Sequence, residues 1–206
     1  PNALEYTIVA AAIVDQGDEA LVFTRSTWHL LDVDNHEFFD SGTLAADFGA
    51  AFNWTDLKAA QGVVQGNPVD VFVFIGTDSY IFNWNTLSNT ASFQSGPYDL
   101  PNHWTNSCCG GSIPDPSLFK AAYCDLENPH NWTNPQVTCP SSTRYGFFLL
   151  TTGQTHFQDY GCGDTFYDDM PYGSYTPFTS SSAPTMADIV AAFFDTTYNR
   201  LYVITH

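Results

Sequence analysis

The chain has few basic residues and no long apolar segment. Its 206 residues contain 5 Lys and Arg against 22 Asp and Glu, which gives a formal net charge of −17. Proteins that bind nucleic acid regardless of its sequence, or that dock on anionic membranes, need Lys and Arg to meet the phosphates. No run of about 18 apolar residues is present, so no transmembrane helix is predicted. We therefore expect neither a nucleic-acid nor a membrane partner.

Cysteine is missing from most of the chain. The five cysteines fall in a single stretch and lack the paired C-x-x-C spacing of zinc sites. They are Cys108, Cys109, Cys124, Cys139 and Cys162. We interpret them as two disulfides plus one free or intermolecular thiol. Asn-Trp-Thr glycosylation sequons at Asn53 and Asn131 indicate the same oxidising route, so we expect a secreted or secretory-pathway protein.

Motifs of common enzymes are also missing. The six histidines form neither H-x-x-x-H nor H-E-x-x-H, and there is no G-x-S-x-G, P-loop or G-x-G-x-x-G. Asp168 with Asp169, or Asp15 with Asp18, could supply paired carboxylates for glycoside hydrolysis. In so acidic a chain, such pairs are more often solvated loops. We therefore predict that the protein is not an enzyme.

What the chain does contain is many short, strand-like runs. Hydrophobic residues make up 44% and aromatic residues 16% of the sequence, enough to form the core of one domain of residues 1–206. Runs rich in β-branched and aromatic residues predict strands. They are Ala20–Phe23, His29–Val33, Val71–Ile75, Ser79–Trp84, Tyr145–Leu150 and Arg200–Ile204. Short strands at this spacing predict an all-β sandwich, barrel or propeller.

An Ala-Ala doublet recurs four times, each time followed by an aromatic and aliphatic strand. We align the copies at Ala10, Lys58, Lys120 and Val190, each of which precedes a doublet. The innermost strands of four blades crowd around a narrow axis, where only small side chains fit. We therefore predict a four-bladed β-propeller with small residues lining a central channel. The blades are expected at about 5–54, 55–115, 116–184 and, incomplete, 185–206.

These repeats resemble those of the hemopexin-like propellers, a family that includes legume seed albumins. Family repeats open with an apolar residue, Asp or Asn, two alanines and an aromatic residue, a pattern that Ile189–Asp195 fits best. The chain departs from the pattern because none of the four doublets follows Asp or Asn. It also ends after the second strand of blade 4. We expect either that Pro1–Thr7 supplies an outer strand or that the natural chain is longer.

The resemblance implies a calcium, magnesium or sodium ion on the channel axis, held by backbone carbonyls. Carbonyl oxygen suits such hard cations. Backbone ligands need no particular side chain, so the loss of Asp does not forbid the site. An axis filled with water is the alternative. Carried over by position, the ligands would be the carbonyl oxygens of Ala10, Lys58, Lys120 and Val190, with a second layer from Ala12, Ala60, Ala122 and Ala192.

The only two lysines, Lys58 and Lys120, occupy the same repeat position in neighbouring blades. Two ammonium groups at one end of the channel would form a local positive site in this acidic chain. We predict that they bind an anionic small molecule, with aromatic side chains as flat walls. The alternative is that both lysines lie along the propeller face or pair with carboxylates.

Taken together, these features favour a non-enzymatic propeller that binds an aromatic anionic pigment or metabolite, as in a chromoprotein. A sugar-binding lectin is the first alternative, because repeats supply several equivalent sites. A storage albumin with affinity for polyamines is the second, and the negative charge favours it. A homodimer is compatible with any of these functions.

Overall fold

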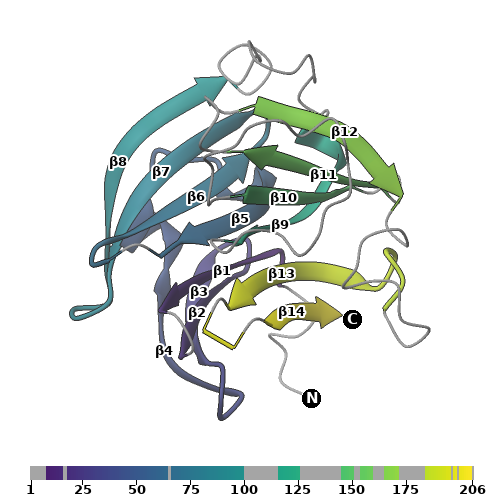
Figure 1. The fold of residues 1–206 in the computed structure, drawn as a ribbon. Helices are drawn as coiled ribbons and strands as arrows, with labels where there is room; N and C mark the ends of the chain where they lie inside the picture. The colour runs from purple at the N-terminus through teal and green to yellow at the C-terminus, as the bar shows by residue number, and fades with distance from the viewer. Residues whose placement is uncertain are drawn as a thin grey trace.

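The structure is a computed structural model. It describes residues 8–15, 18–64, 66–99, 116–125, 145–150, 154–159, 165–171, 184–195, 197–198 and 200–205. These residues form four antiparallel sheets, whose strands pair in the order in which they occur along the chain (Figure 1). No described helix is long and apolar enough to cross a membrane.

Each sheet is one blade. Blade 1 consists of β1 (Ala10–Asp15), β2 (Glu19–Phe23), β3 (Thr27–Asp32) and β4 (Glu37–Thr43). Blade 2 consists of β5 (Leu57–Val63), β6 (Val69–Ile75), β7 (Asp78–Asn85) and β8 (Thr90–Asp99). Blade 3 consists of β9 (Phe119–Asp125), β10 (Tyr145–Leu150), β11 (Gln154–Asp159) and β12 (Thr165–Pro171). Blade 4 consists of β13 (Ile189–Asp195) and β14 (Arg200–Thr205).

The first strands of the four blades surround a common axis. β1 contacts β5 and β13, and β9 contacts the same two strands, so the four form a closed ring (Figure 1). The alanine doublets lie on these innermost strands and are buried. An all-β four-bladed propeller with small residues around its axis is the arrangement that the repeats predicted, and the prediction is confirmed.

Gly62 shows how closely the innermost strands approach each other. A Cβ atom on Gly62 of β5 would lie 1.7 Å from the carbonyl oxygen of Ile13 on β1. No side chain can occupy that space, so only glycine lets the two backbones pass at this point. At this point of the ring the need for a residue without a side chain therefore has a direct steric cause.

Aromatic rings fill the interface between blades 1 and 2. Trp28 of β3 and Trp84 of β7 meet edge to face with ring centroids 5.1 Å apart, a favoured geometry for buried rings. Two short helices connect the blades, η1 (Ala45–Gly49) and η2 (Trp54–Asp56). Phe48 of η1 stacks on Trp84 at 6.0 Å. Asp47 accepts a 2.8 Å hydrogen bond from Trp28 Nε1, so the connection is anchored in the same core.

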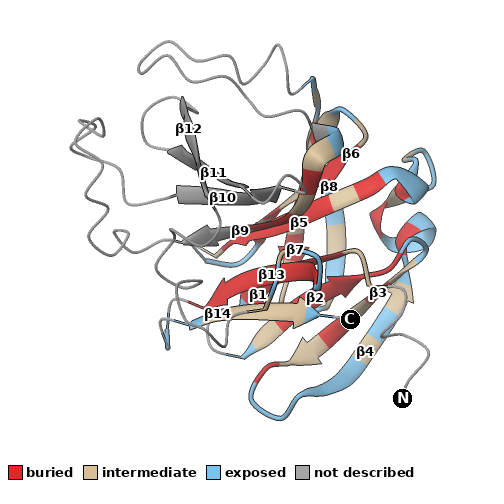
Figure 2. Ribbon diagram, turned by 90° about the vertical axis from the view of Figure 1, so that its right-hand side faces the viewer, coloured by how far each residue is buried: buried red, intermediate tan, exposed pale blue. Residues whose placement is uncertain are grey.

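Blade 4 differs from the others because the described residues give it only two strands. Four consecutive residues of β14, Leu201–Ile204, are half-buried, whereas the corresponding strand of blade 1 is buried almost throughout (Figure 2). The expected contribution of Pro1–Thr7 to this blade lies outside the described residues.

Candidate functional site: the ring that contains the two lysines

Strand pairing shows which residues are equivalent in the four blades. In each blade, one residue of the first strand pairs with the equivalent position of the second strand. In blade 1 this residue is Ala10, which pairs with Phe23, and in blade 2 it is Ala59, which pairs with Phe74. Ala121 and Ala191 are the corresponding residues of blades 3 and 4. The doublet of blade 1 is therefore Ala10–Ala11, and the residue before it is Val9.

Our alignment of the first copy was therefore wrong by one residue. Packing supports the correction, because Ile8 faces blade 4 as Leu57 faces blade 1 and Phe119 faces blade 2. The cause is a bulge between Ile13 and Asp15, which absorbs one extra residue near the end of β1. An alignment without gaps that places Asp15 opposite Asp195 therefore shifts the earlier residues of β1 by one position relative to those of β13.

We call Val9, Lys58, Lys120 and Val190 the lysine ring. They lie at the end of the channel where the innermost strands begin. The pairing skips Lys58, Lys120 and Val190, so each occupies a β-bulge. In blade 1, the Val9 N–H donates a 2.8 Å hydrogen bond to the Phe23 carbonyl. A bulge turns the side chain out of the regular alternation of its strand.

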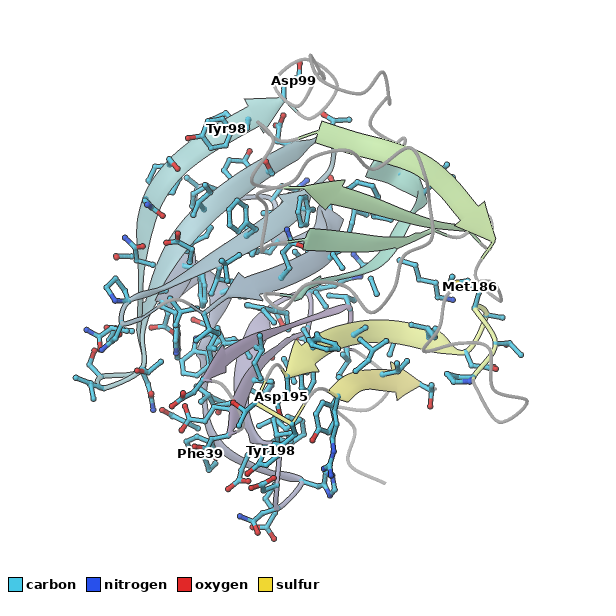
Figure 3. All side chains as sticks on the ribbon, in the orientation of Figure 1. Phe39, Tyr98, Asp99, Met186, Asp195 and Tyr198 are labelled. Atoms are coloured by element: carbon cyan, nitrogen blue, oxygen red, sulfur yellow. The ribbon has the colours of Figure 1, made fainter. Side chains whose placement is uncertain are left out.

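The structure brings the two lysines to the same end of adjacent strands, β5 and β9. Their surroundings differ. Lys120 Nζ donates a 2.8 Å hydrogen bond to the carbonyl of Ala187, which precedes β13, so Lys120 connects blade 3 to blade 4. Met186, the neighbour of Ala187, marks this segment in Figure 3. Lys58 is half-buried and has no hydrogen-bond or ion-pair partner within the described ranges.

The other half of the lysine ring is apolar. Val190 of β13 is buried, and Val9 is half-buried against the core between blades 1 and 2. Because blades 4 and 1 are adjacent, the two valines are neighbours, as are the two lysines. All the charge of the ring therefore lies on one side.

At the opposite end of the innermost strands, β1 ends at the exposed Asp15 and β13 ends at Asp195. Asp195 is buried, and its Oδ1 atom accepts a 2.8 Å hydrogen bond from the N–H of Thr197 in the turn before β14, near Tyr198 (Figure 3). The two ends of the innermost strands therefore carry different charges, with the lysines at one end and Asp15 and Asp195 at the other.

The pKa of Glu19 is affected by the negative charge at this acidic end. Burial raises the pKa of the Glu19 carboxyl, and repulsion from Asp15, Asp18 and Asp32 raises it further. At the same place, the pKa of Asp32 is lowered, chiefly because the side chain and backbone N–H of Asn35 donate hydrogen bonds to its carboxylate.

The described residues contain no group of three or more His, Cys, Asp and Glu side chains that could hold a metal ion. Backbone carbonyls of the innermost strands remain as candidates, and their chemistry suits a hard cation. With the corrected register, Val9 replaces Ala10 in the first layer, and Ala11 replaces Ala12 in the second.

Two groups of this site, Val9 and the Ala187 carbonyl, were not predicted from the sequence. Val9 could have been found, because Ile8–Ala11 reads apolar, Val, Ala, Ala, as Ile189–Ala192 does. The Ala187 carbonyl could not, because it carries no side-chain signal.

The glycosylation sequon at Asn53 is exposed at the start of η2. Asn53 Nδ2 donates a 2.7 Å hydrogen bond to Asp56, and the Thr55 hydroxyl donates to Asn53 Oδ1 at 2.6 Å. Asn131, Cys108, Cys109, Cys139 and Cys162 lie outside the described residues, and only the backbone of Cys124 is described.

No protein-family model matches the chain, and no curated protein does. Solved structures do. A seed albumin from Lathyrus sativus is 16% identical, with a TM-score of 0.69, over 96% of this chain and 82% of the albumin. The hemopexin fold protein CP4 from cow pea is 9% identical, with a TM-score of 0.64, over 97% of this chain and 82% of that protein.

A plant lectin with two metal-binding sites from Cicer arietinum is 13% identical, with a TM-score of 0.63, over 97% of this chain and 83% of the lectin. At these identities the likeness shows the fold alone. The resemblance to hemopexin-like propellers is thereby confirmed at the level of the fold.

Proposed function

We propose that this chain is a non-enzymatic propeller that binds a small anionic ligand at the lysine ring. The observation that carries the proposal is the placement of Lys58 and Lys120. They are the only lysines of a chain with net charge −17, and they stand at equivalent positions on adjacent innermost strands. Because the net charge of the chain repels anions overall, two lysines placed together mark this ring as the site where we expect an anion to be held.

The ligand that we favour is an aromatic pigment or metabolite. Aromatic residues make up 16% of the chain, so flat apolar walls are plentiful for a conjugated ligand. Lysine is a point-charge donor that binds a carboxylate or similar group without demanding one orientation.

A calcium, magnesium or sodium ion is the cofactor that we propose for the channel. The carbonyl oxygens of Val9, Lys58, Lys120 and Val190 would hold it, and such an ion would supply positive charge beside the anion site. In support, one neighbour is described as a lectin with two metal-binding sites.

The visible absorption spectrum of the purified protein tests the proposal. We expect a band beyond the ultraviolet absorbance of the protein, from a ligand that mass spectrometry detects after denaturation. Lys58→Ala together with Lys120→Ala should remove the ligand. Arg200→Ala, which deletes an exposed cation of β14 that lies over the Tyr198 ring, should retain it. If the double lysine variant keeps the ligand with unchanged affinity, the lysine site is wrong.

A sugar-binding lectin is the second candidate. In its favour, an albumin of the same fold from Cicer arietinum is described as showing hemagglutination. It is 13% identical with a TM-score of 0.67, over 97% of this chain and 83% of the albumin. Colourless protein that agglutinates erythrocytes, and that a free sugar inhibits, would favour the lectin. A colourless protein that instead binds spermine would favour the storage albumin.

We also propose secretion and glycosylation at Asn53, because its side chain is exposed in a complete sequon. Expression in a eukaryotic secretory host should give a protein whose mass falls after treatment with peptide-N-glycosidase. Asn53→Gln should remove the part of that shift that belongs to Asn53. If Asn53→Gln leaves the mass shift unchanged, Asn53 is not an acceptor.

A further inference from the structure

We infer that the two lysines have different tasks: Lys58 contacts the anionic group of the ligand, and Lys120 holds blades 3 and 4 together. The uncharged body of the ligand then lies over the valine half of the lysine ring. The inference rests on the proposed function and specifies which class of anion the site takes.

Lys120 already has a structural partner. Its ammonium donates to the Ala187 carbonyl at 2.8 Å, and Ala187 belongs to the segment that leads into β13. A charged donor to a carbonyl is a comparatively strong hydrogen bond. An anion that bound to this ammonium would compete with the contact between two blades.

Lys58 occupies the equivalent bulge one blade earlier but makes no such contact. Its side chain is half-buried, and no described residue pairs with it. A half-buried ammonium loses part of its interaction with water, and a bound anion compensates for this loss. In a chain of net charge −17, the absence of a carboxylate partner from the described residues sets this lysine apart.

Val9 and Val190 form the half of the lysine ring that lies opposite the two lysines. They take the positions of the lysines on blades 1 and 4, so the ring offers no cation on that side. A ligand with anionic groups at both ends would leave one of them over apolar residues, unpaired and partly desolvated. The ring therefore favours an amphipathic monoanion: an aromatic carboxylate or sulfonate with its single acidic group at one end.

A matched pair of fluorescent probes tests this assignment. 8-Anilinonaphthalene-1-sulfonate carries the same rings as N-phenyl-1-naphthylamine plus one sulfonate. We expect the protein to bind the sulfonate about tenfold more tightly, a typical gain for one charged contact. Lys58→Met, which keeps the apolar stem and deletes the charge, should bring the ratio of the two dissociation constants close to one.

The other variants should separate the tasks. Lys120→Met should keep the tenfold ratio and lower the melting temperature. Val9→Thr should weaken both probes by the same factor, because it changes the apolar half alone. Arg200→Met removes an exposed cation elsewhere and should not alter the ratio.

The outcomes distinguish the inference from the proposed function. If the wild-type protein binds neither probe, the proposed function fails. If it prefers the sulfonate and the ratio collapses in Lys120→Met but not in Lys58→Met, or equally in both, the division of tasks is overturned while the anion site stands. Unchanged binding of the neutral probe by Lys58→Met shows that this variant remains folded.

Discussion

Gly62 is a residue at which a single added carbon should be costly. Its Cβ position lies against the Ile13 carbonyl oxygen, so Gly62→Ala must push the backbones of β1 and β5 apart. We expect the free energy of unfolding to fall by about 2–3 kcal/mol, as for an overpacked core. Urea denaturation measures the change. Ser92→Ala on the exposed strand β8 is the control and should stay within about 0.5 kcal/mol of wild type.

Glu19 should make stability depend on pH. Its pKa in the folded chain is raised above the ordinary 4.5, chiefly by burial, so the folded state binds the proton more tightly than the unfolded state does. The favourable contribution is complete below pH 4.5 and is lost as the pH rises through the folded pKa. Glu19→Gln should therefore raise the melting temperature at pH 7 and lose that advantage near pH 4.

Glu37→Gln is the matched control for this effect. Glu37 is an exposed residue of β4, so the same change of net charge should alter the melting temperature much less. A gain for Glu19→Gln of the same size at pH 4 and pH 7 would show that the charge of Glu19 is not responsible.

At the scale of the strand and the turn, the Asn85 side chain holds two backbone N–H groups of the hairpin between β7 and β8. Asn85 Oδ1 accepts the N–H groups of Leu87 at 3.0 Å and Ser88 at 3.2 Å, although Leu87 itself is 90% exposed. Asn85→Ala should lower the free energy of unfolding by about 1 kcal/mol and speed amide exchange at both residues. Asn83→Ala on the same strand should leave both amides unchanged, and equal effects of the two variants would contradict this role.

The strands also show which parts of the fold could be predicted from the sequence. The run of β-branched and aromatic residues at Val71–Ile75 predicted a strand that the structure gives as β6, Val69–Ile75, because burial selects such residues locally. The bulge near Asp15 was not predictable, since any residue type can be the extra one. For that reason the position of Lys58 in the ring followed from sequence. For the first copy the sequence is compatible with either Ala10 or Val9, and the pairing of β1 with β2 decides for Val9.

For the whole molecule, the net charge and the proposed axial cation predict different effects of salt on stability. A net charge of −17 destabilises the compact state by self-repulsion. Sodium chloride should relieve this repulsion gradually over roughly 0.05–0.3 M, because the screening length shortens as the salt concentration rises. A cation held by the carbonyls of the ring acts instead by mass action, which saturates. At about one hundred times its dissociation constant, it would add about 2.7 kcal/mol.

We therefore expect 1 mM calcium or magnesium chloride, added after dialysis against EDTA, to raise the melting temperature by roughly 5–10 °C. If the site holds a divalent ion, sodium chloride at the same ionic strength should do much less. Asp15→Asn should keep the gain, because a carbonyl site needs no carboxylate from the acidic end of the channel. A gain that never saturates in any of these salts would mean that the ions only screen the surface and that water fills the axis, whereas a gain that saturates in sodium chloride as well would mean that the site takes sodium. A gain that Asp15→Asn abolishes would move the ion to the acidic end.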